Sequence, residues 1–225
     1  MHITEDERDA VYKTIYSRRD VRKEFKLDEV PEKILLKILT AAHHAPSVGF
    51  MQPWDFLIVR NSKTKKQVKA AFEQANFEAV KMFNEEKQEK YKSLKLEGIL
   101  EAPVGICVTC DRTRNGPTVL GRTSIPEMDL YSTVCAIQNM WLAARAENLG
   151  MGWVSIIHNE TLQTIFGIPK HIIPVAYLCL GYVSHFHEKP ELEEKGWLQR
   201  ESLDKLVHFE QWGNKKPTEI INDGI

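Results

Sequence analysis

The stretch DLYSTVCAIQNMWLAARAENL, residues 129–149, decides the fold, because small and apolar residues dominate every side of the helix that it predicts. A helix that is apolar all round is buried. We therefore expect residues 129–149 to form a helix at the centre of the fold or at a subunit interface, with Gly150 ending it. Residues 152–157, GWVSII, follow as a predicted strand.

Strands and helices are predicted on both sides of this segment. Apolar runs at residues 54–60, 104–109 and 175–181 indicate buried strands, and residues 31–44, 63–72 and 161–166 carry helical patterns. The charged segment 73–97 is helix-prone; it could be a solvated surface helix or a lid over a site. Interleaved strands and helices imply an α/β or α+β sheet covered by helices on both faces.

Length and composition indicate one globular domain. The chain has 225 residues, 43% of them hydrophobic, and a formal net charge of -1, so no charge excess draws it to nucleic acid or to a membrane. The N-terminus lacks an apolar signal core, and no apolar run is long enough to span a bilayer. We therefore expect a cytoplasmic location.

The cysteines and histidines give no reason to expect a metal. All four cysteines lie in apolar segments, which is typical of buried free thiols: Cys107, Cys110, Cys135 and Cys179. The C-x-x-C spacing at 107–110 would point its two thiols to opposite faces of a strand. The histidine pairs at 43–44 and at 185 and 187 lack regular ligand partners, so surface or capping roles are expected.

The segment SRRDVR, residues 17–22, places three guanidinium groups around one carboxylate. Guanidinium is well matched to bidentate phosphate binding, although a surface charge run is the ordinary alternative. Arg200, in GWLQR at 196–200, could likewise bind phosphate or be an ordinary surface charge. The irregular loop 111–123 is long enough to be functional or disordered. Dinucleotide, Walker, nucleophile-elbow and H-E-x-x-H motifs are absent.

Four segments together resemble the flavin-binding nitroreductase superfamily: SRRDVR, APSVGFMQPW at 45–54, GWVSI at 152–156 and the late LGY followed by an arginine. Asp20, TCDRTRNGPTVLGRT at 109–123 and PEMDLYSTVCAIQNMWLAARAENLGMGWVS at 126–155 resemble its 5,6-dimethylbenzimidazole synthase branch, the BluB proteins. The resemblance covers about residues 12–213.

The resemblance implies a nitroreductase-like α+β fold, with a mostly antiparallel central sheet flanked by helices, in an intertwined homodimer. FMN would lie at the subunit interface. The chain would be a single domain over residues 1–225, with an extension from about residue 182 that wraps the partner. The implied reaction fragments FMNH2 with O2 to 5,6-dimethylbenzimidazole, the lower ligand of vitamin B12, and D-erythrose 4-phosphate. A separate NAD(P)H-flavin reductase would supply FMNH2.

The resemblance also implies site residues. Asp20 and Ser155 would move protons, and arginine neighbours would favour the ionised Asp20 carboxylate unless burial competes. Flavin would be bound by residues from the arginine cluster, the proline-containing loop, the third predicted strand and the late basic position: Arg18, Arg19, Asp20, Val21, Arg22, Pro46, Ser47, Met51, Gln52, Gly152, Trp153, Val154, Ser155 and Arg200. The charged segment 73–97 and the loop 111–123 would be candidates for a cover that excludes water.

One position departs from the wider superfamily. Many nitroreductases carry Asn in the flavin loop where this chain has Phe50, which makes ordinary nitroreduction less favoured. Two alternatives stay open: an NAD(P)H-dependent nitro- or quinone reductase that retains FMN, and a non-catalytic flavin-binding protein.

Overall fold

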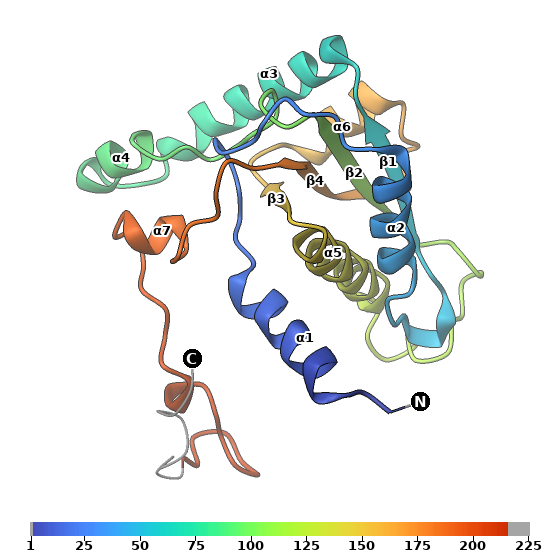
Figure 1. Ribbon diagram of the computed structural model, residues 1–225. Helices are drawn as coiled ribbons and strands as arrows, with labels where there is room; N and C mark the ends of the chain where they lie inside the picture. Colours follow the sequence, from blue (N-terminus) through green and yellow to red (C-terminus); the bar gives the residue numbers. More distant parts are fainter. Residues whose placement is uncertain (1, 216–225) are drawn as a thin grey trace. The chain divides into compact units, whose positions relative to one another are not determined.

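The computed structural model describes residues 2–215 (Figure 1), and these fall into two compact units, 2–188 and 189–215. The first unit contains the sheet and most of the helices. The second contains the short helix α7 (Glu191–Glu194) and a 3-10 turn at Leu203–Lys205. Within residues 2–215, no helix is long and apolar enough to cross a membrane.

A single antiparallel sheet forms the centre of the first unit. Its strands are β1 (Trp54–Val59), β2 (Val104–Asp111), β3 (Leu149–Val154) and β4 (Ile172–Tyr182), in the order β1-β2-β4-β3. Every neighbouring pair is antiparallel, with a register shift in β2 between Val108 and Thr109. The expected mostly antiparallel sheet is thereby confirmed.

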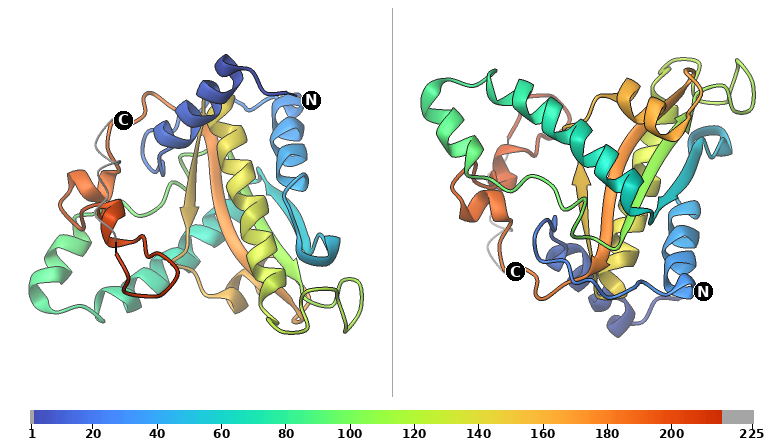
Figure 2. Two further views of the ribbon diagram at one scale, coloured as in Figure 1. Left: turned by 90° about the horizontal axis from the view of Figure 1, so that it is seen from below. Right: turned by 90° about the horizontal axis from the view of Figure 1, so that it is seen from above.

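Helices cover both faces of this sheet. On one face lie α2 (Glu32–His43) and α5 (Met128–Ala146), whose buried side chains share a core with alternate residues of β2 and β4. On the other lie α3 (Ser62–Val80) and α6 (Asn159–Phe166), around Cys107 and Tyr177. Figure 2 shows α5 and α3 on opposite faces. The helix α1 (Glu5–Ser17) contacts α5, and α4 (Glu85–Lys92) follows α3.

The central helix α5 occupies the place that its composition predicts, with two corrections. It ends at Ala146 rather than at Gly150, because Asn148 adopts a left-handed φ of 57° and turns the chain into β3, where Gly150 is a strand residue. Cys135 is exposed, whereas the other three cysteines are buried as expected. A helix beside only one sheet face keeps some positions open, which apolar composition alone does not reveal.

The helix α3 is longer than the pattern predicts, since it runs through the expected boundary at residue 72. The Asn61 side chain caps its first turn by accepting from two backbone N–H groups, and Val68, Phe72 and Ala75 continue one buried stripe along it. Phe77, two residues after Ala75, is 59% exposed. The segment 73–97 is therefore partly core, so neither a purely solvated helix nor a lid describes all of it.

Candidate active site

The segment 20–22 runs beside β3, to which an isolated β-bridge connects it. Asp20 forms a parallel bridge with Met151, and the Val21 N–H donates to the Met151 carbonyl at 3.0 Å. The Trp153 N–H donates to Asp20 Oδ1, also at 3.0 Å. A Cβ at Gly152 would stand 2.1 Å from the Val21 carbonyl oxygen, so only glycine permits this approach. Four of the predicted flavin residues are thus brought together by backbone contacts.

The Asp20 carboxylate is held at both oxygens. While Trp153 donates to Oδ1, Arg22 Nη2 donates to Oδ2 at 2.7 Å. Burial raises the pKa of Asp20 above its ordinary value, and this outweighs the lowering by Arg22, by the Trp153 N–H and by Arg18. The arginine neighbours were expected to favour the ionised form unless burial competed, and burial is the larger effect.

Arg18 and Arg19 are oriented by different contacts. The Arg18 guanidinium lies 4.8 Å from the centre of the Trp141 ring, whose Nε1 donates to the Arg19 carbonyl at 3.3 Å. Arg19 Nη1 donates to the carbonyls of Tyr16 and Arg18, both at 2.8 Å. Arg19 Nε and Ser17 Oγ are buried without a hydrogen-bond partner among the described residues. Such unsatisfied buried groups are costly to a folded protein.

A fourth guanidinium joins this cluster and was missed in the sequence. Arg145, near the end of α5, donates through Nε to the Ser17 carbonyl at 3.3 Å and lies 4.1 Å from the Phe186 ring centre. Burial, followed by the charge of Arg19, lowers the pKa of Arg145. The sequence pattern of this helix does not indicate that Arg145 belongs to the site, because its position beside Ser17 depends on how α1 packs against α5.

The loop at residues 46–52 forms a second group with unusual backbone geometry. Gly49, Phe50 and Gln52 have φ values of 59°, 52° and 46°. The Gln52 N–H donates to Ser47 Oγ at 3.1 Å, which closes the loop on itself. Met51 is buried, while Phe50 is 80% exposed. Pro46 is exposed at the start of the loop.

The loop at 111–123 braces this second group. Arg114 Nη1 donates to the carbonyls of Gln52 and Trp54 at 2.7 and 2.9 Å, and Asn115 donates to the Met51 carbonyl at 2.9 Å. Arg122 pairs with the buried Asp129 of α5. These polar side chains therefore shape the 46–52 loop.

One chain does not bring the two groups together. Figures 1 and 2 show α5 between the 18–22 segment, beside α1 and β3, and the 46–52 loop, which follows α2. Val154 is buried in the core at the end of β3, and Ser155 is exposed just beyond it. Arg200 belongs to the second unit, where it lines a hollow with Leu198 and other residues of that unit.

The fold and this arrangement agree with the matches to known proteins. The Nitroreductase family matches residues 15–182. Solved structures with the same fold include a BluB-like flavoprotein from Clostridium difficile 630, with a TM-score of 0.66 and 19% identity over 89% of this chain and 99% of that one. Another is an iodotyrosine deiodinase bound to FMN and 3-iodo-L-tyrosine, with a TM-score of 0.66 and 22% identity over 79% and 91% of the two chains.

The chain belongs to the nitroreductase family, as the sequence resemblance predicts. Among its relatives, a 5,6-dimethylbenzimidazole synthase from Rhodospirillum rubrum is 40% identical over 86% of this chain and 91% of its own length. A second protein of that name, from Rhodobacter capsulatus, is 35% identical over 88% of this chain and 95% of its own length. The similarity to this branch of the family thus extends over nearly the whole chain.

Proposed function

We propose that this protein is a 5,6-dimethylbenzimidazole synthase that uses FMNH2 and O2 as substrates and releases D-erythrose 4-phosphate as the second product. The observation that carries the proposal is the 40% identity to a protein of that name over 91% of its length. The half-buried Asp20 carboxylate within an arginine cluster supports it, because the reaction needs both a phosphate-binding site and a group that moves protons.

The arginine cluster fits the flavin chemically. In the proposal, Arg18, Arg19 and Arg22 bind the phosphate and the ring edge. The unsatisfied Arg19 Nε and Ser17 Oγ support a polar ligand at this place, and a phosphate oxygen accepts from both donors. In the proposal, the ring edge lies beside Gly152, Trp153 and Val154, and the missing side chain of Gly152 lets the Val21 backbone bring the arginines to β3. FMN, when bound in reduced form, supplies the isoalloxazine that reacts with O2.

Asp20 is the proposed proton-transfer group. Its oxygens are fixed by Trp153 and Arg22, so the carboxyl has one orientation. The raised pKa brings it closer to neutral pH, where a group can both take and return a proton. Ser155, whose hydroxyl both donates and accepts, is proposed to relay a proton at the same edge of the flavin.

The complete site is proposed to need a homodimer. Since α5 separates the two halves in one chain, a second copy would contribute Pro46, Ser47, Met51 and Gln52. The helix α1 supports this, because none of its residues is buried, and it exposes Val11, Tyr12, Ile15 and Tyr16. The C-terminal extension is proposed to wrap the partner and to bring Arg200 to the phosphate. A separate NAD(P)H-flavin reductase would supply FMNH2.

The test adds photoreduced FMN and air to the purified protein and follows flavin and benzimidazole by mass spectrometry. Flavin should disappear as 5,6-dimethylbenzimidazole appears. Flavin that reoxidises intact would contradict the proposal and favour a flavin-binding protein. Steady NAD(P)H oxidation with a nitroaromatic or quinone would instead identify a reductase.

The Asp20→Asn variant tests the proton-transfer role. It should retain FMNH2 binding and stop benzimidazole formation. Glu32→Gln is a matched control, because Glu32 also pairs with an arginine, Arg60, at 3.1 Å, but contacts neither group of predicted site residues. Product formation at the parental rate in Asp20→Asn would show that Asp20 has another role.

A further inference from the structure

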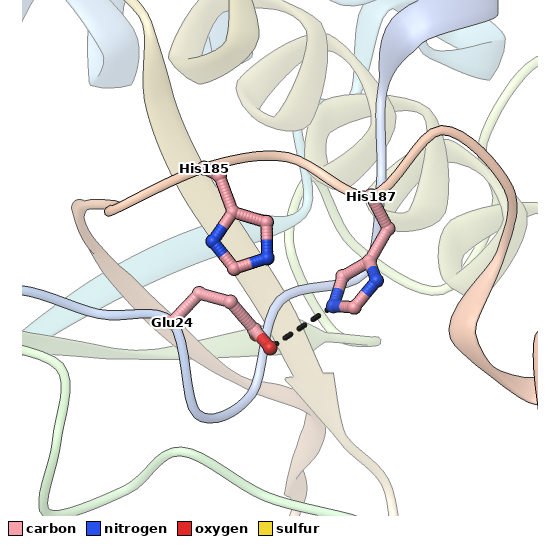
Figure 3. Close-up of side chains that lie close together, drawn as sticks. All are labelled: Glu24, His185 and His187. Carbon is pink, nitrogen blue, oxygen red and sulfur yellow. Dashed lines mark hydrogen bonds and ion pairs between the residues drawn. The ribbon is translucent and has the colours of Figure 1, made fainter.

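Three side chains that can bind a metal come together from distant parts of the sequence, beside residues 17–22, the arginine segment. Glu24 comes from the chain between α1 and α2, whereas His185 and His187 come from the segment after β4 (Figure 3). One ligand atom from each lies within 4.8 Å of the other two. Glu24 is therefore a third ligand beside the histidine pair. The sequence does not reveal it, because Glu24 and His187 are 163 positions apart.

Backbone pairing brings the two segments together. Phe25 and Val183 form an antiparallel bridge, the Lys26 N–H donates to the Tyr182 carbonyl at 2.8 Å, and the Ser184 N–H donates to the Glu24 carbonyl at 2.9 Å. The same pairing carries His185 and His187, which follow Ser184 directly, to the Glu24 carboxylate. The cluster is therefore held by main-chain hydrogen bonds and does not depend on flexible side chains alone.

The Glu24 carboxylate has one oxygen held by the protein and one facing the histidines. Oε2 accepts from the Lys23 and Arg22 N–H groups at 3.2 and 3.4 Å, and Oε1 lies 3.0 Å from His187 Nε2. Glu24 is 5% exposed. Outer contacts of this kind orient a ligand toward a metal and are a regular part of metal sites.

His185 has a similar outer contact. Its Nδ1 lies 3.1 Å from Ser184 Oγ, which leaves Nε2 as the ring nitrogen available to a metal. Its ring centre is 5.2 Å from that of His187, and Figure 3 shows both rings on the same side as Glu24. His185 is exposed and Glu24 is buried, so the cluster opens to solvent on one side. A metal could enter there and keep a water molecule as a further ligand.

We propose that Glu24, His185 and His187 bind a divalent transition metal of the zinc class, which joins the chain after β4 to the arginine segment. Two imidazoles and one carboxylate suit Zn²⁺, whereas Ca²⁺ and Mg²⁺ prefer oxygen ligands. Tetrahedral zinc with bonds of about 2.0–2.2 Å separates its ligand atoms by about 3.3 Å. The 3.0 Å between Glu24 and His187 is close to that value, and rotation of His185 closes the remainder.

An ordinary hydrogen-bonded pair is the competing explanation, and the chain contains one for comparison. His158 Nε2 lies 2.8 Å from Glu78 Oε2, with both side chains largely exposed. That pair belongs to no group of three metal-ligating side chains within residues 2–215. His158→Ala therefore removes a histidine from a carboxylate without affecting the proposed metal site.

The experiment titrates the full-length protein, stripped with a chelator, with Zn²⁺ against a chromophoric competitor. One Zn²⁺ should bind per chain and should raise the midpoint of thermal unfolding. His185→Ala and His187→Ala should each weaken Zn²⁺ binding at least about 100-fold, whereas Ser184→Ala, which removes only an outer contact, should weaken it about ten-fold. His158→Ala should bind Zn²⁺ as the parent does.

His185→Ala is the decisive variant. His185 is exposed and its ring lies within hydrogen-bonding distance of the adjacent Ser184 hydroxyl, so the metal-free variant should unfold at the parental temperature. The proposal would be overturned if the parent protein does not bind Zn²⁺, or if His185→Ala binds Zn²⁺ as tightly as the parent does. Because the readouts are metal stoichiometry and unfolding temperature, they do not depend on the proposed flavin reaction.

Discussion

Replacing Gly152 with alanine should detach the arginine segment from β3. The new Cβ would lie 2.1 Å from the Val21 carbonyl oxygen, whereas ordinary contact begins at 3.4 Å, so the segment must retreat by about 1.3 Å, the difference between the two. A hydrogen bond of 3.0 Å does not survive that shift. The two at risk are Val21 N–H to Met151 and Trp153 N–H to Asp20.

The cost follows from the kinds of hydrogen bond lost. A neutral bond contributes about 1 kcal/mol and one to a charged group about 1.5–3 kcal/mol, so Gly152→Ala should lose about 2.5–4 kcal/mol. For a chain of this size the unfolding midpoint should fall by roughly 5–15 °C. Calorimetry measures that shift, and anaerobic titration with FMNH2 should show at least about ten-fold weaker binding.

Gly105→Ala is the matched control. Its Cβ would also meet an atom at 2.1 Å, but that atom is the Tyr177 hydroxyl, a side-chain group away from the arginine segment. Gly105→Ala should lose stability and keep FMNH2 affinity. If Gly152→Ala unfolds within about 0.5 kcal/mol of the parent, the ordinary scatter of harmless substitutions, and binds FMNH2 equally well, the contact between Val21 and β3 does not hold the site.

Three further predictions concern stability and reactivity. Phe50→Asn should stabilise the protein by about 1 kcal/mol in urea unfolding, because asparagine tolerates the positive φ of this exposed position; a loss would contradict this. Glu97→Gln should cost about 3–5 kcal/mol at pH 7, since Lys69 and Lys95 both donate to this buried carboxylate. Those interactions hold the pKa of Glu97 below its ordinary value of 4.5 despite burial. The stabilisation by Glu97 is therefore present above pH 4.5 and is lost as the pH falls through the lower pKa of the folded state. If the unfolding free energies of parent and variant depend equally on pH in acid, the prediction is refuted. Maleimide at pH 8 should leave the three buried thiols unlabelled in native protein, as burial raises the pKa of Cys107 to about 12; a labelled peptide from Cys107, Cys110 or Cys179 would disprove it.

Local patterns predicted the strands β1, β2 and β4 and the central helix well, because each of these strands is a compact apolar run. The strand predicted at 152–157 was wrong by three residues, since β3 runs over Leu149–Val154. They failed at boundaries set by other parts of the chain. The helix α3 continues past residue 72 because its buried stripe continues, and α5 stops before Gly150 because Asn148 turns the chain. Burial against the sheet decides how far α3 continues, whereas the left-handed Asn148 decides where α5 stops.

The sequence by itself determined the family, the antiparallel fold and the kinds of side chain at the predicted flavin site, because motifs such as SRRDVR can be recognised directly in the sequence. Only the tertiary structure decided how those residues behave. It packs Asp20 against β3, so burial outweighs its arginine neighbours. It also adds Arg145 to the cluster and brings Glu24 to His187 across 163 positions. The polarity of the surroundings of Asp20 and the contacts between distant residues both arise from packing, so they cannot be predicted from any short stretch of sequence.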